Sequence, residues 1–414
     1  MNVATREQLR QRTDYTHKPN LKTGRHGWLR LTPAYSVKVV EEVIGRYDGR
    51  YDRPMRVFDP FCGTATTALS AAYHGHHGVT TDINSFLIWL GRAKVAQYSA
   101  EEIEATRDAG KQAVALVRCG SVVPVPIPPI HNIERWWPAA ALQFLCSLRA
   151  SLEQVSAPGS PVQTLLMVAF CRTLIGLSNA AFNHQSMSFK DALPLLPLDL
   201  NMGDLYVEDL RFVLAGAAQN PEGTGEILLD DARDLSKVPG GFDLVVTSPP
   251  YANRMSYIRE LRPYMYWLGF LMNGRDAGEL DWKAIGGTWG IATSRLLEWS
   301  RPVEVFRSAH LEGVLKEVAH TDNKNGHLLS LYIDKYFVDM WAHLQALCGK
   351  VSPGGQVHYI VGNSTFYGVL LAVEQVYAEM MLSLGFRDVT CRAIRKRNSK
   401  KELVEFDVTG TWPG

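Results

Sequence analysis

The stretch Phe242-Asp243-Leu244-Val245-Val246-Thr247-Ser248-Pro249-Pro250-Tyr251 predicts a buried strand that ends abruptly. Its first six residues are mostly apolar or β-branched, which is typical of a strand that is buried on both faces. The two prolines cannot donate the backbone hydrogen bonds that would continue a central strand. We therefore expect the serine, the prolines and the aromatic ring to lie just beyond the carboxyl end of the strand, where ligands bind in open α/β sheets.

This loop suits chemistry on an exocyclic amine. The amino group of a nucleobase is a poor nucleophile because its lone pair is delocalised into the ring. We expect the Ser248 side chain and the Pro249 carbonyl to accept from both N–H groups and so free the lone pair, with Pro250 stiffening the backbone. Tyr251 would stack on a base drawn out of its helix. The alternative is a strand that simply ends in a Pro-Pro turn.

A second stretch predicts a cofactor site. Met55-Arg56-Val57-Phe58-Asp59-Pro60-Phe61-Cys62-Gly63-Thr64-Ala65-Thr66-Thr67 indicates a strand, a tight turn with a glycine, and the start of a helix. The next strand, from Gly78, ends in Asp82-Ile83-Asn84, about 20 residues past the glycine turn, where an acidic residue holds a ribose diol. The alternative is that Asp82 or Asn84 caps the following helix.

A third acidic strand end follows at Glu226–Leu235. It carries Asp230-Asp231-Ala232-Arg233, which resembles motif III of the S-adenosylmethionine-dependent methyltransferases, and the resemblance implies that the acidic residue accepts a hydrogen bond from the adenine amino group of the cofactor. By position this residue is Asp231, although the sequence leaves Asp230 open.

The motifs resemble those of the S-adenosylmethionine-dependent amino-methyltransferases of DNA. Ser-Pro-Pro-Tyr is similar to motif IV in its N4-cytosine form, whereas Asp and Asn variants are typical of N6-adenine enzymes. Asp-Pro-Phe-Cys-Gly resembles motif I, Asp-Ala-Arg motif III, and the segment before a helix at 36–44, capped by Ser36, motif X. The resemblance implies S-adenosylmethionine as cofactor, bound by Thr32, Asp59, Phe61, Cys62, Gly63, Asp82, Ile83, Asp231, Ala232 and Ser248. The family usually has a second glycine where this chain has Ala65, a change we expect to be tolerated if the φ angle there is negative.

The resemblance covers about residues 28–98 and 226–410. It implies an α/β protein with the Rossmann-like class I methyltransferase sheet, mostly parallel with an antiparallel closing hairpin. Residues 1–27 read as a polar arm, 28–98 as the first part of the core and 223–414 as the second. Between them, 99–222 reads as an inserted, mainly helical lobe with Trp136 and Trp137 in its core, and 273–325 as a second, irregular insertion. Either insertion could read the DNA sequence.

Several polar residues are candidates for contact with DNA. Arginines follow motif IV, amides occupy the end of the inserted lobe, and cations fill the turn of the closing hairpin. These candidates are Arg254, Arg259, Arg262, Asn179, Asn183, Lys396 and Arg397. A solvated helix face, a polar loop or a charged hairpin turn would give the same residues. Asn363, at the end of a later strand, is a candidate for the wall of the target pocket.

Composition narrows the class of protein. The 414 residues carry a formal net charge of +1, so any DNA-binding field must come from local clusters. Six cysteines are scattered without a Cys-x-x-Cys pair, which predicts no metal site and a reducing, cytoplasmic location. The amino terminus is polar, unlike a signal peptide, and no apolar run is long enough to span a membrane.

These expectations combine into one function. The sequence predicts a cytosine-N4 methyltransferase that flips its target out of double-stranded DNA, acts as a monomer or homodimer, and belongs with a cognate endonuclease to a restriction–modification system. The alternatives are adenine-N6 methylation by the same geometry, methylation of structured RNA, and an inactive DNA-binding subunit.

Overall fold

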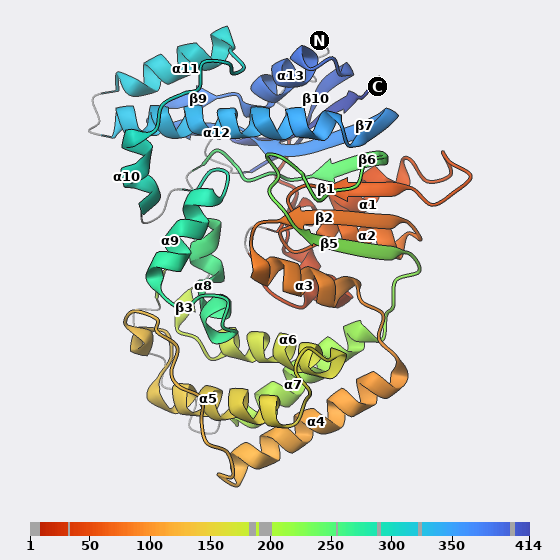
Figure 1. The fold of residues 1–414 in the computed structure, drawn as a ribbon, viewed down its shortest axis with the longest axis vertical. Helices are drawn as coiled ribbons and strands as arrows, with labels where there is room; N and C mark the ends of the chain where they lie inside the picture. The colour runs from red at the N-terminus through yellow and green to blue at the C-terminus, as the bar shows by residue number, and fades with distance from the viewer. Residues whose placement is uncertain are drawn as a thin grey trace.

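The computed structural model describes residues 9–31, 34–181, 188–189, 201–253, 256–287, 291–321, 325–397 and 402–414. Its centre is a seven-stranded sheet with helices on both faces (Figure 1). The strand order is β5 (Thr224–Leu229), β2 (His77–Asp82), β1 (Arg56–Asp59), β6 (Phe242–Thr247), β7 (Val351–Gly362), β11 (Val404–Thr411) and β10 (Arg387–Lys396). The first five strands are parallel, whereas β11 is antiparallel to both of its neighbours. This confirms the predicted Rossmann-like sheet with its antiparallel closing hairpin.

The strand order reverses between β1 and β6. From β1 the chain moves outward to β2 and β5, and from β6 it moves in the opposite direction to β7. In doubly wound sheets ligands bind in the crevice at the carboxyl ends of the two strands that flank such a reversal. Motif I follows β1 and motif IV follows β6, so both motifs lie at this edge.

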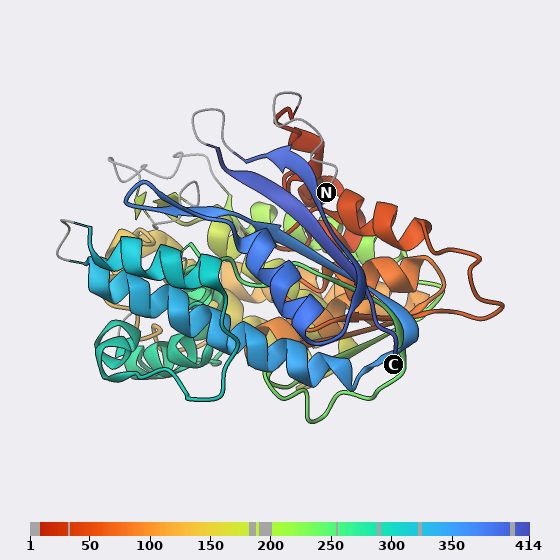
Figure 2. The ribbon, with the colours of Figure 1, turned by 90° about the horizontal axis from the view of Figure 1, so that it is seen from above.

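Both faces of the sheet are buried. Helices α1 (Val37–Gly45), α2 (Thr66–Tyr73) and α3 (Ser85–Val95) lie on one face, and α12 (Gly326–Cys348) and α13 (Val373–Ser383) lie on the other (Figures 1 and 2). In β6, Leu244 and Val246 pack toward α1, while Phe242 and Val245 pack toward α12 and α13. A central strand covered on both sides carries mostly apolar residues, which explains why four of the six residues of β6 are apolar.

The inserted helices are α4 (Ala100–Arg118), α5 (Ala139–Gln154), α6 (Pro161–Gly176) and α7 (Met202–Ala217). They share one hydrophobic cluster with α3 of the sheet and with α8 (Tyr257–Trp267), so α3 is sandwiched between the sheet and the inserted helices (Figure 1). Trp136 and Trp137 lie inside this cluster, with 6% and 0% of their surface exposed, as the sequence predicted.

The amino-terminal segment is a packed part of the fold rather than the polar arm that we expected. Arg25 has no exposed surface and its guanidinium donates to four backbone carbonyls. Two of these carbonyls, of Gly216 (2.9 Å) and Ala217 (2.7 Å), lie at the end of α7, and the other two, of Lys94 (2.8 Å) and Ala96, lie at the end of α3. The last carbonyls of a helix have no partner within the helix, so one buried arginine satisfies two helix ends at once. Its charge is thereby hydrogen-bonded without a carboxylate bonded to it.

The region 273–325 is also more regular than predicted. It contains α9 (Gly274–Lys283), α10 (Ile291–Glu298) and α11 (Ala309–Ala319). The Pro-Gly-Gly sequence at 353–355 lies within β7, where the register against β6 shifts. The remaining strands form two small hairpins: β3 (Ala180–Ala181) with β4 (Ser188–Phe189), and β8 (Ser364–Phe366) with β9 (Val369–Leu371). None of the described helices is long and apolar enough to cross a membrane.

Candidate active site

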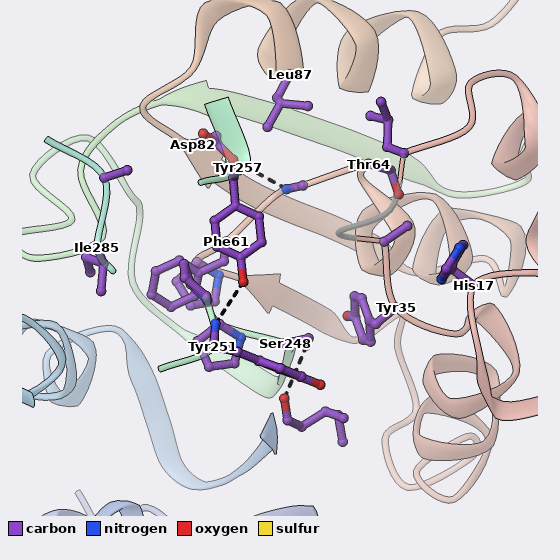
Figure 3. A pocket seen from close by; sticks show the side chains of 18 of the residues that line it. His17, Tyr35, Phe61, Thr64, Asp82, Leu87, Ser248, Tyr251, Tyr257 and Ile285 are labelled. Atoms are coloured by element: carbon purple, nitrogen blue, oxygen red, sulfur yellow. Dashed lines mark hydrogen bonds between the residues drawn. The ribbon is translucent and has the colours of Figure 1, made fainter. Parts of the chain in front are cut away.

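A cavity of about 330 Å³ lies at the carboxyl edge of the sheet, where the strand order reverses (Figure 3). It brings together residues from three predicted motifs that are far apart in the sequence. The predicted residues in its wall are Phe61, Gly63, Asp82, Ile83, Asp231, Ala232, Ser248, Pro249, Pro250, Tyr251 and Arg397.

Asp59 lies beneath this cavity rather than in its wall. It is fully buried and accepts hydrogen bonds from the Thr247 hydroxyl (2.6 Å), the Thr67 hydroxyl (2.9 Å) and the Phe61 amide (3.0 Å). Burial raises the pKa of this carboxyl to about 7, although the hydrogen bonds oppose the shift. Asp59 therefore connects motif I to the end of β6. Its carboxylate lies outside the cavity wall, although we predicted that it would contact the cofactor directly.

Cys62 is similarly placed behind the cavity wall. Its side chain is 1% exposed, and its backbone amide donates to the Thr81 carbonyl at 2.7 Å. It is absent from the residues that line the cavity in the described part of the chain.

Ala65 adopts a left-handed backbone with φ of +57°, which is the opposite of the condition we set for tolerating it. A left-handed conformation costs a residue with a Cβ roughly 1–2 kcal/mol. The methyl group is nevertheless fully buried in the cluster of α2 and α3, with Cys62 and Leu69, and it does not enter the cavity. Gly63, with φ of +48°, is the residue at which the backbone itself faces the cavity.

The alternative roles of Asp82 and Asn84 are separated by the structure. Asn84 caps α3, because its side-chain oxygen accepts from the Phe86 amide at 3.0 Å. Asp82 lies in the wall of the cavity (Figure 3) and accepts from the backbone amides of Asn84 (2.8 Å) and Gly63 (3.4 Å). Burial raises the pKa of Asp82 to about 6, so its carboxylate is charged at neutral pH.

Both acidic residues after β5 reach the cavity. The Asp231 carboxylate pairs with Arg233, whose Nε and Nη2 lie 3.0 Å and 2.6 Å from its two oxygens. Asp230 is 7% exposed and accepts from the Ser236 hydroxyl (3.2 Å) and the Lys237 amide (2.8 Å). Asp231 is the more exposed of the two, with 32% of its side chain accessible.

A buried histidine fixes the backbone beside Asp231. The Nδ1 of His343 lies 2.7 Å from the Ala232 carbonyl, to which it donates, so Nε2 accepts from the Tyr359 hydroxyl at 2.6 Å. Burial lowers the pKa of His343 to about 4, so it is neutral. The edge of its ring also packs against Phe61, at 4.9 Å between centroids.

The loop after β6 is held from three sides. The Ser248 hydroxyl donates to the Ile360 carbonyl of β7 at 3.2 Å, and the Tyr251 amide donates to the Tyr257 hydroxyl of α8 at 2.8 Å (Figure 3). The Tyr336 hydroxyl of α12 lies 2.8 Å from the Pro250 carbonyl. Within the described residues the Pro249 carbonyl accepts no hydrogen bond. The loop is thus rigid, with one hydroxyl oxygen and one carbonyl still able to accept.

The closing hairpin contributes Arg397, which we predicted as a DNA contact, and two charged residues that the sequence did not assign to the site, Arg395 and Glu405. The Tyr251 hydroxyl donates to Glu405 at 2.9 Å, and Arg395 holds the same carboxylate at 2.8 Å and 3.1 Å. The guanidinium carbon of Arg397 lies 4.9 Å from the centre of the Tyr251 ring. Arg395 lies one residue before the end of β10 and Arg397 directly follows the strand, and both line the cavity. The position of Arg395, near the end of a strand pair next to β7, is the signal that could have found it.

The amino-terminal segment also reaches the cavity, through Tyr15, Thr16 and His17. Tyr35, from the predicted motif X, lines the cavity and hydrogen-bonds through its hydroxyl to Thr67, with Asp59 at 3.4 Å. The composition of the amino-terminal segment gives no sign that Tyr15, Thr16 and His17 line a cavity, because a solvated terminus would have a similar composition.

Other predicted contacts fall elsewhere. Asn179 is 2% exposed, so its side chain is not on a DNA-facing surface, and its backbone amide donates to the Trp136 carbonyl. Asn363 is 1% exposed and joins β7 to the start of β11 through the Val404 amide at 2.8 Å, outside the cavity wall. Arg259 and Arg262 are partly exposed on α8, and Lys396 is partly exposed at the end of β10. Thr32, Asn183 and Arg254 lie outside the described residues.

Comparison with known proteins points to methyl transfer. No model of a protein family matches the chain. The chain is 21% identical to the type II methyltransferase M.BsoBI of Geobacillus stearothermophilus, over 94% of this chain and 84% of that protein. It is 20% identical to the type II methyltransferase M.MvaI of Kocuria varians, over 78% of this chain and 74% of that protein. A solved rRNA methyltransferase, aviRa of Streptomyces viridochromogenes, aligns over 95% of this chain and 92% of its own, with 11% identity and a TM-score of 0.30. In sequence along most of its length, this chain therefore resembles the type II methyltransferases.

Proposed function

We propose that this protein transfers a methyl group from S-adenosylmethionine to the exocyclic N4 of cytosine in double-stranded DNA, after flipping the base out of the duplex. The observation that carries the proposal is the rigid loop at 248–251, in which the Ser248 oxygen and the Pro249 carbonyl are left as acceptors beside the Tyr251 ring. Two acceptors at one end of a stacking surface match the two N–H groups of an aromatic amine.

The chain would activate the amine by position alone. The Ser248 hydroxyl hydrogen is already directed to the Ile360 carbonyl, so the serine oxygen faces the amine as an acceptor. With the Pro249 carbonyl on the second N–H, the nitrogen lone pair is released from conjugation with the ring. Fixed dipoles of this kind need no reorganisation during the reaction. The nitrogen becomes acidic once it is methylated and gives its proton to solvent, so the site requires no strong base.

The opposite end of the cavity fits the cofactor. Gly63 lets backbone approach a ligand closely, and the Asp82 carboxylate would accept from the ribose hydroxyls. Asp231, more exposed than Asp230, would accept from the adenine amino group, between the apolar surfaces of Ile83 and Ala232. Asp59 and Cys62 would act from beneath, by fixing the turn. When bound, S-adenosylmethionine supplies an electrophilic methyl group.

The biological setting rests on the two relatives, which are named type II methyltransferases. We infer that the chain modifies a specific DNA site as part of a restriction–modification system, with a cognate endonuclease, as a monomer or homodimer. The insertions 99–222 and 273–325 are the candidate sequence readers, with Arg259, Arg262 and Lys396 as candidate backbone contacts. Thr32, Asn183 and Arg254 stay as candidates from sequence. Adenine N6 is the second candidate target, since the same loop geometry would hold its amine.

The test is nucleoside mass spectrometry on DNA from cells that express the wild type, Ser248→Ala or Ser383→Ala. Ser383 is an exposed serine at the end of α13 and serves as the matched control. We expect N4-methylcytosine with the wild type and Ser383→Ala, and its loss with Ser248→Ala at unchanged cofactor affinity. Full activity of Ser248→Ala would remove this serine from the mechanism. N6-methyladenine would keep the site and change the base, and no methylated base despite bound cofactor would contradict a DNA substrate.

A further inference from the structure

We propose that Arg397 selects the target base, by donating a hydrogen bond to the O2 carbonyl of cytosine at the far end of the ring from the amine. The proposal rests on the function proposed above and adds the residue that distinguishes cytosine from adenine. Four features of the cavity support it.

The first feature is the position of Arg397 in the target end of the cavity. Its guanidinium lines the cavity and lies 4.9 Å from the centre of the Tyr251 ring, the surface proposed to stack on the base. Its backbone amide donates to the Leu403 carbonyl at 2.7 Å, and its Nη1 donates to the Asn363 carbonyl at 3.1 Å. The side chain is therefore anchored at both ends rather than extended into solvent.

The second feature is the space made for this guanidinium. A methyl group at Gly362, the last residue of β7, would lie 2.5 Å from Nη1 of Arg397 and 3.1 Å from its guanidinium carbon. Glycine at this position lets the guanidinium pack directly against the backbone of the strand, and any larger residue would displace it.

The third feature is charge. Arg395, near the end of β10, makes two hydrogen bonds to Glu405. This carboxylate neutralises Arg395 and also accepts a hydrogen bond from the Tyr251 hydroxyl. No carboxylate of a described residue forms a salt bridge with Arg397. A guanidinium has five N–H donors and no acceptor, so the remaining donors of Arg397 suit a ligand that offers a carbonyl or ring nitrogen.

The fourth feature is the spacing along β7. Ser248 contacts this strand at the Ile360 carbonyl, and Arg397 lies over Gly362 two residues further along, about 7 Å away in an extended strand. The amine and the O2 carbonyl of cytosine lie at opposite ends of its Watson–Crick edge, so two contacts separated along β7 can serve the two ends. A base with its amine at Ser248 would point the other end of that edge toward Arg397. Cytosine has a carbonyl there, whereas adenine has a C–H that would leave the donors unpaired.

The experiment uses the intact protein and a chemical change in the base. The methylated site is first mapped in DNA modified by the wild type. Synthetic duplexes then carry at the target position either cytosine or a 2-aminopyridine C-nucleoside, which keeps the amine and adjacent ring nitrogen but has C–H in place of O2. Methyl transfer to both is measured for the wild type, Arg397→Met, and the control Arg392→Met, which changes an exposed arginine of β10 that pairs with Asp407.

We expect the wild type and Arg392→Met to prefer cytosine over the analogue by roughly tenfold to a hundredfold, the value of one good charged contact to a base. Arg397→Met should act on both bases at similar rates, because its rate on cytosine falls to that on the analogue. Gly362→Ala, which displaces the guanidinium without removing it, should reduce the preference in the same direction. Cofactor affinity of each variant, measured by calorimetry, reports whether the fold is intact.

A preference that survives in Arg397→Met, or that is absent from the wild type, would overturn the role of Arg397 while leaving the proposed function in place. A wild type that methylates no DNA would overturn both.

Discussion

Replacing Tyr257 with phenylalanine removes one oxygen atom and tests whether the catalytic loop depends on its anchor to α8. The Tyr257 hydroxyl accepts from the Tyr251 amide at 2.8 Å, and it belongs to a separate element, so the contact is not maintained by local geometry. A buried N–H without a partner costs about 1–3 kcal/mol. This cost can lower either the free energy of unfolding or the rate of turnover. If the loop stays in place, the free energy of unfolding falls, and if the loop moves to find water, turnover falls.

The two losses are expected to sum to about 1–3 kcal/mol, which corresponds to a decrease in kcat of about 5- to 150-fold if the loop moves. The assay combines single-turnover methyl transfer with unfolding in urea, and calorimetry checks that cofactor affinity is unchanged. Tyr264→Phe is the matched control, because this tyrosine lies on the same helix and its hydroxyl makes only a long 3.4 Å contact to the Arg30 carbonyl. Turnover and unfolding free energy both equal to those of the wild type would refute the idea that α8 holds the loop.

Three further substitutions test the floor and the cofactor end of the site. Asp82→Asn should weaken cofactor binding about tenfold at pH 8, as measured by calorimetry. Binding by the wild type should weaken as the pH falls through the raised pKa of Asp82, about 6. A wild-type affinity that does not change with pH would exclude a contact from a charged Asp82. Burial raises the pKa of Asp59 from 3.8 to about 7, so the folded protein holds a proton in this window that the unfolded chain has released, and stability falls as pH rises. Asp59→Asn should remove up to about 4 kcal/mol of that pH dependence in urea unfolding at pH 4 and pH 8, and an unchanged slope would contradict the assignment. Ala65→Gly relieves about 1 kcal/mol of strain in the left-handed backbone and loses about 0.8 kcal/mol of stabilisation from the buried methyl group. The free energy of unfolding and the cofactor affinity should therefore both stay near those of the wild type. Tenfold tighter cofactor binding would show that the methyl group obstructs the cofactor.

The sheet and the walls of the cavity were predictable because their signals are local. The apolar runs of β1, β2 and β6 each end in a residue type that a ligand site uses, and parallel strands bring those ends together at one edge. The antiparallel hairpin of β10 and β11 was also predicted correctly. For 273–325, local signals existed but were missed: Asn273 and Ser308 cap α9 and α11, yet the glycines at 286 and 287 suggested an irregular loop.

What the sequence could not reveal depends on contacts between distant residues. Asp59 reads the same whether its carboxylate faces a ligand or the Thr247 hydroxyl, which is 188 residues away. An asparagine in a polar stretch, such as Asn179, gives no sign that it will be buried against Trp136. Glu405 enters the site only because β11 returns beside β7, so its role follows from the topology and not from its neighbours in the chain.

The buried Arg25 has a consequence for exchanging the inserted helices between related proteins. Its guanidinium joins the last turn of the inserted helix α7 to the last turn of α3 in the core, and Arg172 of α6 donates in return to the Gly27 and Trp28 carbonyls. The inserted helices are therefore bonded to residues outside 99–222 and are not an independent unit. A chimera that imports 99–222 from a relative would meet a foreign surface around Arg25, with a buried cation facing carbonyls that no longer align. Transplanting the segment 24–31 together with the insertion would keep the hydrogen bonds of Arg25 to α7 and of Arg172 to the Gly27 and Trp28 carbonyls.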